Sequence, residues 1–237
     1  MATRPIFVPI SKKPFFEKLD VEFEWHPGFS LVQKQKSLES LHRNAKKQYG
    51  LGELLEISSK SPVQIGNRLS AFNLKAHTKD ENYCSNMDFS LETVFQTSKV
   101  FKKNIHCVDL LGNDQREIRK LAKEREPLGL TGFRLEGADW SLKPKGAFYN
   151  FIYIKSLLNI PEIREKLIPY EGFTDIEFNQ KKSINCQAEA VSMYTGLRKG
   201  GIDPARACSG QAEFLRMVYG AYEKSGNETV NFLDSIS

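Results

Sequence analysis

The stretch Ser90-Leu91-Glu92-Thr93-Val94-Phe95-Gln96-Thr97-Ser98-Lys99-Val100-Phe101 is the most informative segment of this chain. At 3.6 residues per turn, a spacing of seven residues is nearly two full turns. A helix through the segment would therefore carry Glu92, Phe95, Gln96 and Lys99 on one face. A lysine that is partly buried beside apolar groups is a candidate amine nucleophile, because desolvation lowers its pKa.

A charged helix face also has a simpler interpretation. Lysine and glutamate side chains on helices are mostly solvated and carry no chemistry. Periodicity alone favours this solvated face. The catalytic interpretation of Lys99 therefore depends on the rest of the chain.

The composition is that of an ordinary globular chain. It has 237 residues, of which 40% are hydrophobic and 27% are charged, and these fractions are common in soluble domains. A chain of this length buries roughly 70% of its unfolded surface, so a sizeable core needs no disulfide or metal. The net charge of +5 favours a phosphate-bearing or nucleic-acid partner, although a small net charge also simply keeps a protein dissolved.

The four cysteines, Cys84, Cys107, Cys186 and Cys208, match neither a zinc motif nor a disulfide framework. We therefore expect reduced thiols in a cytoplasmic protein. No stretch reaches the ~18 apolar residues of a membrane span, and the N-terminus does not read as a signal peptide. We expect no metal, no cofactor and no membrane partner.

The hydrophobic patterns predict an α+β fold that is rich in helix and has short strands. Residues 21–25 alternate apolar and polar side chains, as a half-buried strand does. Residues 30–49 have helical periodicity, and Gly50 ends that helix. Residues 147–158 are apolar and aromatic throughout, which predicts a core helix.

The chain contains no repeat and no low-complexity linker. We therefore expect one domain over residues 1–237, with an N-terminal extension over about 1–50 and a loose tail over about 225–237. Two polar segments carry the donors that phosphate groups need. The first holds Ser58, Ser59 and Lys60, and the second holds Lys182, Ser183 and Asn185.

The residues Glu92, Phe95, Gln96 and Lys99 resemble the signature helix of the NADAR family, which has the pattern Glu-x-x-Phe-Gln-x-x-Lys-hydrophobic. The segment Leu69-Ser70-Ala71-Phe72-Asn73 resembles the family's Leu-Ser-Asn-Phe segment. One branch of the family is encoded with DarT-type toxins. Segments similar to that branch are 27–30, 33–37, 56–62, 173–179 and 181–188.

This resemblance implies a NADAR-type fold and an ADP-ribosylglycohydrolase activity. In that branch the toxin attaches ADP-ribose to guanine bases of DNA, and the NADAR partner removes it. The implied substrate is ADP-ribosylated DNA, or ADP-ribose itself, and the implied role is that of an antitoxin. Phage-borne relatives serve as counter-defence against such toxins.

The resemblance assigns the nucleophile to Lys99, whose amine would capture the electron-poor anomeric carbon of ribose. Glu92 is the expected acid/base, and Asp175 is the second candidate carboxylate. Burial would lower the pKa of Lys99 whereas Glu92 would raise it, and the sequence leaves this conflict open. The expected ligand-binding residues are Ser58, Ser59, Lys60, Ser70, Phe72, Asn73, Gln96, Trp140, Lys182, Ser183 and Asn185.

Two other functions remain open. One is an N-glycosidase that acts on a small metabolite similar to those of riboflavin synthesis. The other is a non-catalytic protein that reads ADP-ribose or inhibits a toxin by binding it. The net charge of +5 favours a nucleic-acid substrate over a metabolite, and the intact pair Glu92 and Lys99 argues against a reader, which needs no buried amine.

Overall fold

The computed structural model describes residues 1–76, 78–83, 89–179, 185–220, 222–224 and 228–230. The N-terminal sheet has the strand order β2-β1-β8-β3, in which β8 pairs antiparallel with β1 and parallel with β3. Its strands are β1 (Ala2–Pro9), β2 (Phe16–Phe23), β3 (Leu54–Glu56) and β8 (Gly172–Thr174). The parallel pairing brings Thr174 opposite Glu56, which are far apart in the sequence.

The second sheet is antiparallel and has the strand order β5-β4-β6-β7. Its strands are β4 (Lys99–Phe101), β5 (Ile105–His106), β6 (Leu130–Leu135) and β7 (Ala138–Ser141). A separate two-stranded sheet pairs β9 (Tyr222–Lys224) antiparallel with β10 (Glu228–Val230). Strand β10 therefore lies inside the tail, residues 225–237, that the sequence suggests is loose. The other residues of that tail, 225–227 and 231–237, lie outside the described residues.

The helices are α1 (Leu31–Tyr49), α2 (Gln64–Arg68), α3 (Leu91–Thr97), α4 (Gln115–Glu124), α5 (Ala147–Leu157), α6 (Pro161–Arg164), α7 (Gln187–Lys199), α8 (Pro204–Ala207) and α9 (Gln211–Phe214). Helix α1 begins after Ser30, whose hydroxyl accepts from the Gln33 amide, and ends at Gly50, which has φ +67°. The predicted α+β fold, rich in helix and with short strands, is confirmed. None of the described helices combines the length and the apolarity that crossing a bilayer demands.

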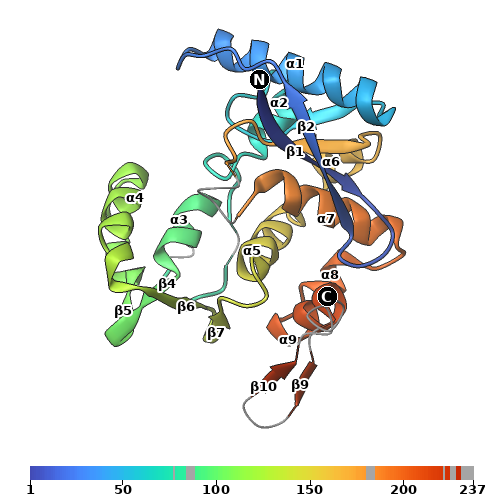
Figure 1. Cartoon of the computed structure of the whole chain (residues 1–237). Helices are drawn as coiled ribbons and strands as arrows, with labels where there is room; N and C mark the ends of the chain where they lie inside the picture. The colour runs from blue at the N-terminus through green and yellow to red at the C-terminus, as the bar shows by residue number, and fades with distance from the viewer. Residues whose placement is uncertain (77, 84–88, 180–184, 221, 225–227, 231–237) are drawn as a thin grey trace.

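The core lies on both faces of the N-terminal sheet. Ile6 packs in one cluster with Leu41 of α1, whereas the next residue, Phe7, packs in the larger cluster with residues of α5 and α7, because side chains alternate across a strand. Figure 1 shows α1 on one side of β1 and β2, and α7 and α5 on the other. Residues 1–50 thus supply two strands and a helix of the sheet layer.

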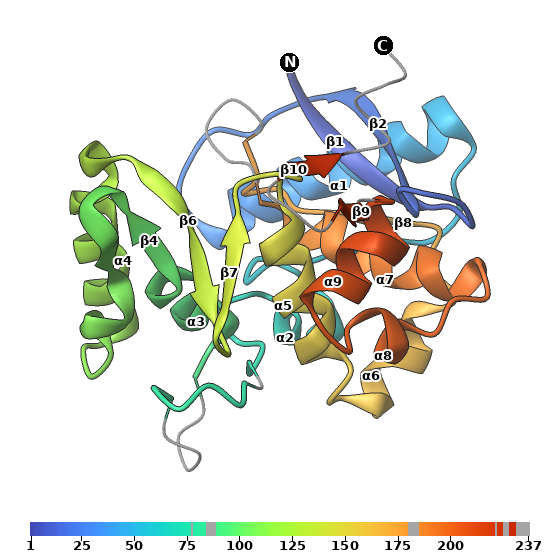
Figure 2. The same ribbon diagram turned by 90° about the horizontal axis from the view of Figure 1, so that it is seen from below.

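Helix α5 is the central element of the fold. All of its residues except Lys155 are buried, as expected for a helix that is apolar on every side. Seen from below, α5 lies between the second sheet and α7 (Figure 2). This arrangement puts the second sheet, α3 and α4 on one side of α5 and the N-terminal sheet on the other.

The prediction of one helix carrying both Glu92 and Lys99 is wrong at its C-terminal end. Helix α3 stops at Thr97, and Lys99 is the first residue of β4. The hydroxyl groups of Thr97 and Ser98 both donate back to the carbonyl of Val94, and such bonds compete with helix hydrogen bonds. Pairing of β4 with β6 then takes up the backbone groups that another helical turn would need.

Candidate active site

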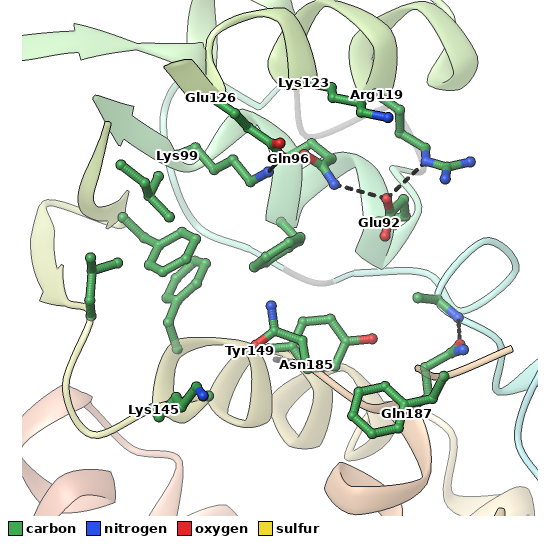
Figure 3. A pocket seen from close by; sticks show the side chains of 18 of the residues that line it. Glu92, Gln96, Lys99, Arg119, Lys123, Glu126, Lys145, Tyr149, Asn185 and Gln187 are labelled. Atoms are coloured by element: carbon green, nitrogen blue, oxygen red, sulfur yellow. Dashed lines mark hydrogen bonds and ion pairs between the residues drawn. The ribbon is translucent and has the colours of Figure 1, made fainter. Parts of the chain in front are cut away.

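A cleft of about 1000 Å³ opens between two walls of the molecule. One wall consists of α3, α4, β4 and β6, and the other consists of the β7–α5 connection, the start of α5 and the segment after β8. Figure 3 shows Glu92, Gln96 and Lys99 pointing into this space from one wall, and Lys145, Tyr149 and Asn185 lying on the opposite side.

Helix α3 positions Glu92 and Gln96. The helix begins after Ser90, whose hydroxyl accepts from the Thr93 amide, and the Glu92 amide donates to the Ala71 carbonyl over 2.9 Å. Gln96 Nε2 donates to Glu92 Oε1 over 3.0 Å. A second contact, of 3.3 Å, joins Glu92 Oε1 to Arg119 Nε of α4. The side chain of Glu92 is therefore held from two directions at the cleft wall.

Strand β4 positions Lys99 in the wall of the cleft. The residue is only 8% exposed, and its Nζ lies 5.5 Å from the centroid of the Phe95 ring. Glu126 Oε1 lies 3.8 Å from the same Nζ. Burial lowers the pKa of Lys99, and the attraction of Glu126 and Glu92 only partly opposes this shift. The conflict that the sequence leaves open is therefore decided in favour of burial.

Asp175 is a further carboxyl group of the cleft and comes directly after β8. It is buried, and it accepts from Gln187 Nε2 over 3.0 Å and from the Glu177 amide over 3.2 Å. Burial, and next the nearby carboxylate of Glu56, raise the pKa of Asp175 to about 7. A carboxyl group of this kind carries a proton at neutral pH far more often than an exposed aspartate does.

Glu56 is a fully enclosed carboxyl group behind Asp175. It accepts from the hydroxyl groups of Ser58 and Thr174, each over 2.6 Å, and from the Ile176 amide over 2.9 Å. Burial raises the pKa of Glu56, and these three donors oppose that rise. These three donors favour the ionised form of Glu56, whereas its burial favours the protonated form.

The cleft gathers about half of the residues that the sequence suggests. The predicted residues that line it are Phe72, Glu92, Gln96, Lys99, Asp175 and Asn185. Those that the structure puts elsewhere are Ser58, Ser59, Lys60, Ser70, Asn73 and Trp140. Lys182 and Ser183 lie outside the described residues.

The predicted residues away from the cleft have other contacts. The side chain of Asn73 donates to Asn67, and the carbonyl of Ser59 accepts from the Asn67 side chain. Ser70 is buried, and among the described residues its Oγ has no hydrogen-bond partner. Trp140 packs in the core against Phe148, Phe151 and Phe214. For Trp140 the core position, which aromatic residues commonly take, is the one observed.

Sequence reasoning missed several cleft residues. They are Arg116, Arg119, Lys120, Lys123, Glu126, Lys145, Tyr149 and Gln187. The four cations on α4 follow the helical spacing i, i+3, i+4 and i+7, and this spacing is a signal that the sequence does contain. What the spacing leaves undefined is the direction of the face, which depends on the packing of α4 against α3.

The walls also contain a contact between a cation and an aromatic ring. The guanidinium carbon of Arg119 lies 5.0 Å from the centroid of the Phe72 ring, a cation–π geometry. In the part of the chain that the structure describes, no group of three or more His, Cys, Asp or Glu side chains could hold a metal ion.

Comparison with known proteins identifies the family of this chain. No curated protein matches the sequence. The sequence model of a family described as "DarT1-associated NADAR antitoxin" matches residues 2–228. Because this match covers nearly the whole chain, it supports an antitoxin role, and the chain belongs to the DarT1-associated NADAR antitoxin family.

Proposed function

We propose that the protein is an ADP-ribosylglycohydrolase that removes ADP-ribose from guanine bases of DNA. The observation that carries the proposal is the amine of Lys99, which is buried in the cleft wall and has a lowered pKa. An amine whose pKa is lowered by burial, with the carboxyl groups of Glu92 and Asp175 on the same cleft, suits attack on a sugar carbon. Membership of the family supplies the class of toxin that would create the substrate.

The first step forms a bond between Lys99 Nζ and the anomeric carbon of the ribose. The amine supplies the electron pair, the bond from that carbon to the guanine nitrogen breaks, and guanine leaves with the bonding electrons. The sugar carbon is electron-poor in such a transition state. The covalent route divides one difficult displacement into two easier steps.

Two carboxyl groups divide the proton transfers. Asp175, with its pKa raised to about 7, gives a proton to the departing guanine. Glu92, which accepts from Gln96 and is paired with Arg119, takes a proton from the nitrogen of Lys99 after attack. The ribose ring opens to an imine, and water hydrolyses the imine to release ADP-ribose and restore the amine. Acid–base assistance of this kind contributes roughly 10²–10⁴-fold.

The test is release of ADP-ribose from a single-stranded oligonucleotide that carries ADP-ribosylated guanine. The wild type should release it, and Lys99→Ala should lower the rate by at least ~10³-fold while still binding the oligonucleotide. Lys47→Ala is the matched control, because Lys47 is an exposed lysine of α1 outside the cleft. Trapping of a lysine–sugar adduct by borohydride in the wild type, and its absence from Lys99→Ala, would identify the imine directly.

Other outcomes would point to the other functions. Full turnover by Lys99→Ala would remove Lys99 from the chemistry. Tight binding without release by the wild type would favour a non-catalytic reader or toxin inhibitor. Release from a small N-glycoside, with none from the oligonucleotide, would favour a metabolite glycosidase.

A further inference from the structure

We infer that one face of α4 is a docking surface for the DNA strand next to the modified base. The α4 basic face consists of Arg116, Arg119, Lys120 and Lys123, all of which line the cleft. The inference rests on the proposed function and extends it, because it makes the substrate a polynucleotide strand rather than a single nucleotide.

The positive and negative side chains of α4 lie on different sides of the helix. Each residue of a helix advances by about 100°, so the four cations occupy an arc of roughly 100°. Ile118 and Ala122 are buried on the opposite side of the helix. The two carboxylates of the same helix, Glu117 and Glu124, do not line the cleft. All of the cations of α4, and none of its carboxylates, therefore face the cleft.

Among the described residues, most of this positive charge is not neutralised by an ion pair. Arg119 is paired with Glu92 over 3.3 Å. In the described part of the chain, Arg116, Lys120 and Lys123 have no ion-pair partner, although ion pairs are common elsewhere on the surface. Neighbouring like charges repel one another, and phosphate groups of a bound strand would remove that repulsion.

The α4 basic face is longer than the pyrophosphate group of one ADP-ribose. Positions 116 to 123 extend about 10 Å along the helix axis. The two phosphorus atoms of the ADP-ribose pyrophosphate share one bridging oxygen, so this group can meet only part of that length. Successive phosphates of a polynucleotide backbone are spaced along the strand and would meet the remaining cations.

A stacking platform lies at the same wall. Phe72 is 37% exposed and lines the cleft, and the Arg119 guanidinium lies against its ring. Proteins that bind single strands combine a cationic track with an aromatic ring on which a base stacks. Phe72 and the α4 basic face together provide this combination. We therefore expect a base adjacent to the modified guanine to stack on the exposed part of the Phe72 ring.

The binding test uses an unmodified single-stranded oligonucleotide with a fluorescent label, followed by anisotropy over a range of salt concentrations. We expect the double variant Lys120→Glu with Lys123→Glu to bind at least tenfold more weakly than wild type. The slope of log affinity against log salt should fall by about 1.4, since each contact to a single strand contributes about 0.7. The control, Lys47→Glu with Lys166→Glu, makes the same charge change on exposed residues outside the cleft and should bind like the wild type.

The activity test separates this inference from the proposed function. ADP-ribose release is measured from the modified oligonucleotide and from the corresponding modified nucleoside. The α4 double variant should lose at least tenfold more kcat/KM on the oligonucleotide than on the nucleoside. Equal losses on the two substrates, or oligonucleotide binding equal to that of the wild type, would overturn the docking surface.

If the wild type released no ADP-ribose from either substrate, the proposed function would fail, and salt-dependent binding lost in the α4 double variant would still support the surface. In another outcome, neither the wild type nor the α4 double variant binds the unmodified strand, and the wild type hydrolyses nucleoside and oligonucleotide equally well. That outcome would support the hydrolase and overturn the α4 basic face as a docking surface.

Discussion

At the scale of single residues, two ionisable groups have their proton affinity set by their surroundings. Burial lowers the pKa of Lys99 although Glu126 and Glu92 favour its charged form. Burial and Glu56 together raise the pKa of Asp175 to about 7. The lysine thus moves toward the neutral form that a nucleophile needs, and the aspartic acid moves toward the protonated form that a general acid needs.

Glu126→Gln should shift the pH profile of the proposed hydrolase reaction toward acid. The proposed reaction needs a neutral Lys99, so activity should rise with pH through the pKa of that amine. Removing the nearest carboxylate lowers this pKa further. We expect the rising limb of kcat/KM against pH to move to lower pH in Glu126→Gln. The same limb should keep its position in Glu124→Gln, which changes a carboxylate of α4 outside the cleft.

Glu56→Gln should shift the other limb of the profile. In the proposed mechanism Asp175 acts when protonated, so activity should fall as the pH rises through its pKa of about 7. Loss of the Glu56 charge lowers that pKa, and the falling limb should therefore move to lower pH. Other groups near Asp175 that remain in this variant are Glu177, Tyr149, Tyr153 and Cys186. Exposed Glu53, changed to Gln, is the control, and an unmoved limb in Glu56→Gln would contradict the electrostatic role.

At the scale of elements, the stability of the short helix α3 depends on the contacts at its two ends. Its N-terminal cap is Ser90, whose hydroxyl accepts from the Thr93 amide over 3.1 Å and also contacts the side chain of Gln115 at the start of α4. At the other end the chain turns directly into β4. A helix of this length is not stable alone, so its cap and its packing against α4 and α5 hold Glu92 and Gln96 at the cleft.

Ser90→Ala should destabilise the protein and disturb the cleft. Loss of a serine cap costs about 1 kcal/mol in the free energy of unfolding, and urea denaturation measures it. Ser30→Ala removes the equivalent cap of α1 and should cost a similar amount. Only Ser90→Ala should also lower kcat/KM, because of these two helices only α3 carries cleft residues. Equal kinetic effects of the two substitutions would show that the α3 cap has no special part in positioning Glu92.

At the scale of the whole molecule, the cleft exists because two layers meet at α5. Helix α5 is buried on nearly all sides, and its first residues, with Tyr149 among them, form one wall of the cleft. Trp140 of β7 joins the second sheet to this helix through Phe148 and Phe151. These ring contacts therefore hold the second sheet against α5.

Trp140→Phe should lower the free energy of unfolding by at least ~1 kcal/mol, because the smaller ring leaves part of a filled core site empty. It should change the affinity for ADP-ribose little, since Trp140 does not line the cleft. Urea denaturation and calorimetric titration with ADP-ribose measure the two quantities. A large loss of affinity with unchanged stability would return Trp140 to the ligand-binding role that the sequence suggests.

The sequence by itself determined the features that arise from local chemistry. The end of α1 at Gly50, the apolar run of α5 and the motif residues Glu92, Gln96 and Lys99 are readable because periodicity and short-range hydrogen bonds act between near neighbours. The end of α3 at Thr97 was not readable in this way, since pairing with β6, a distant segment, replaces the next helical turn.

Only the tertiary structure decided how the pKa values of Lys99 and Asp175 shift and which way the cations of α4 point. Lys99 is buried because β4 lies in a sheet, and Asp175 stands beside Glu56 because β3 and β8 are parallel neighbours. The cations of α4 face the cleft because Ile118 and Ala122 are packed on the other side. Desolvation and charge–charge interaction depend on distances in space, and for these residues those distances are set by pairings between segments far apart in the sequence.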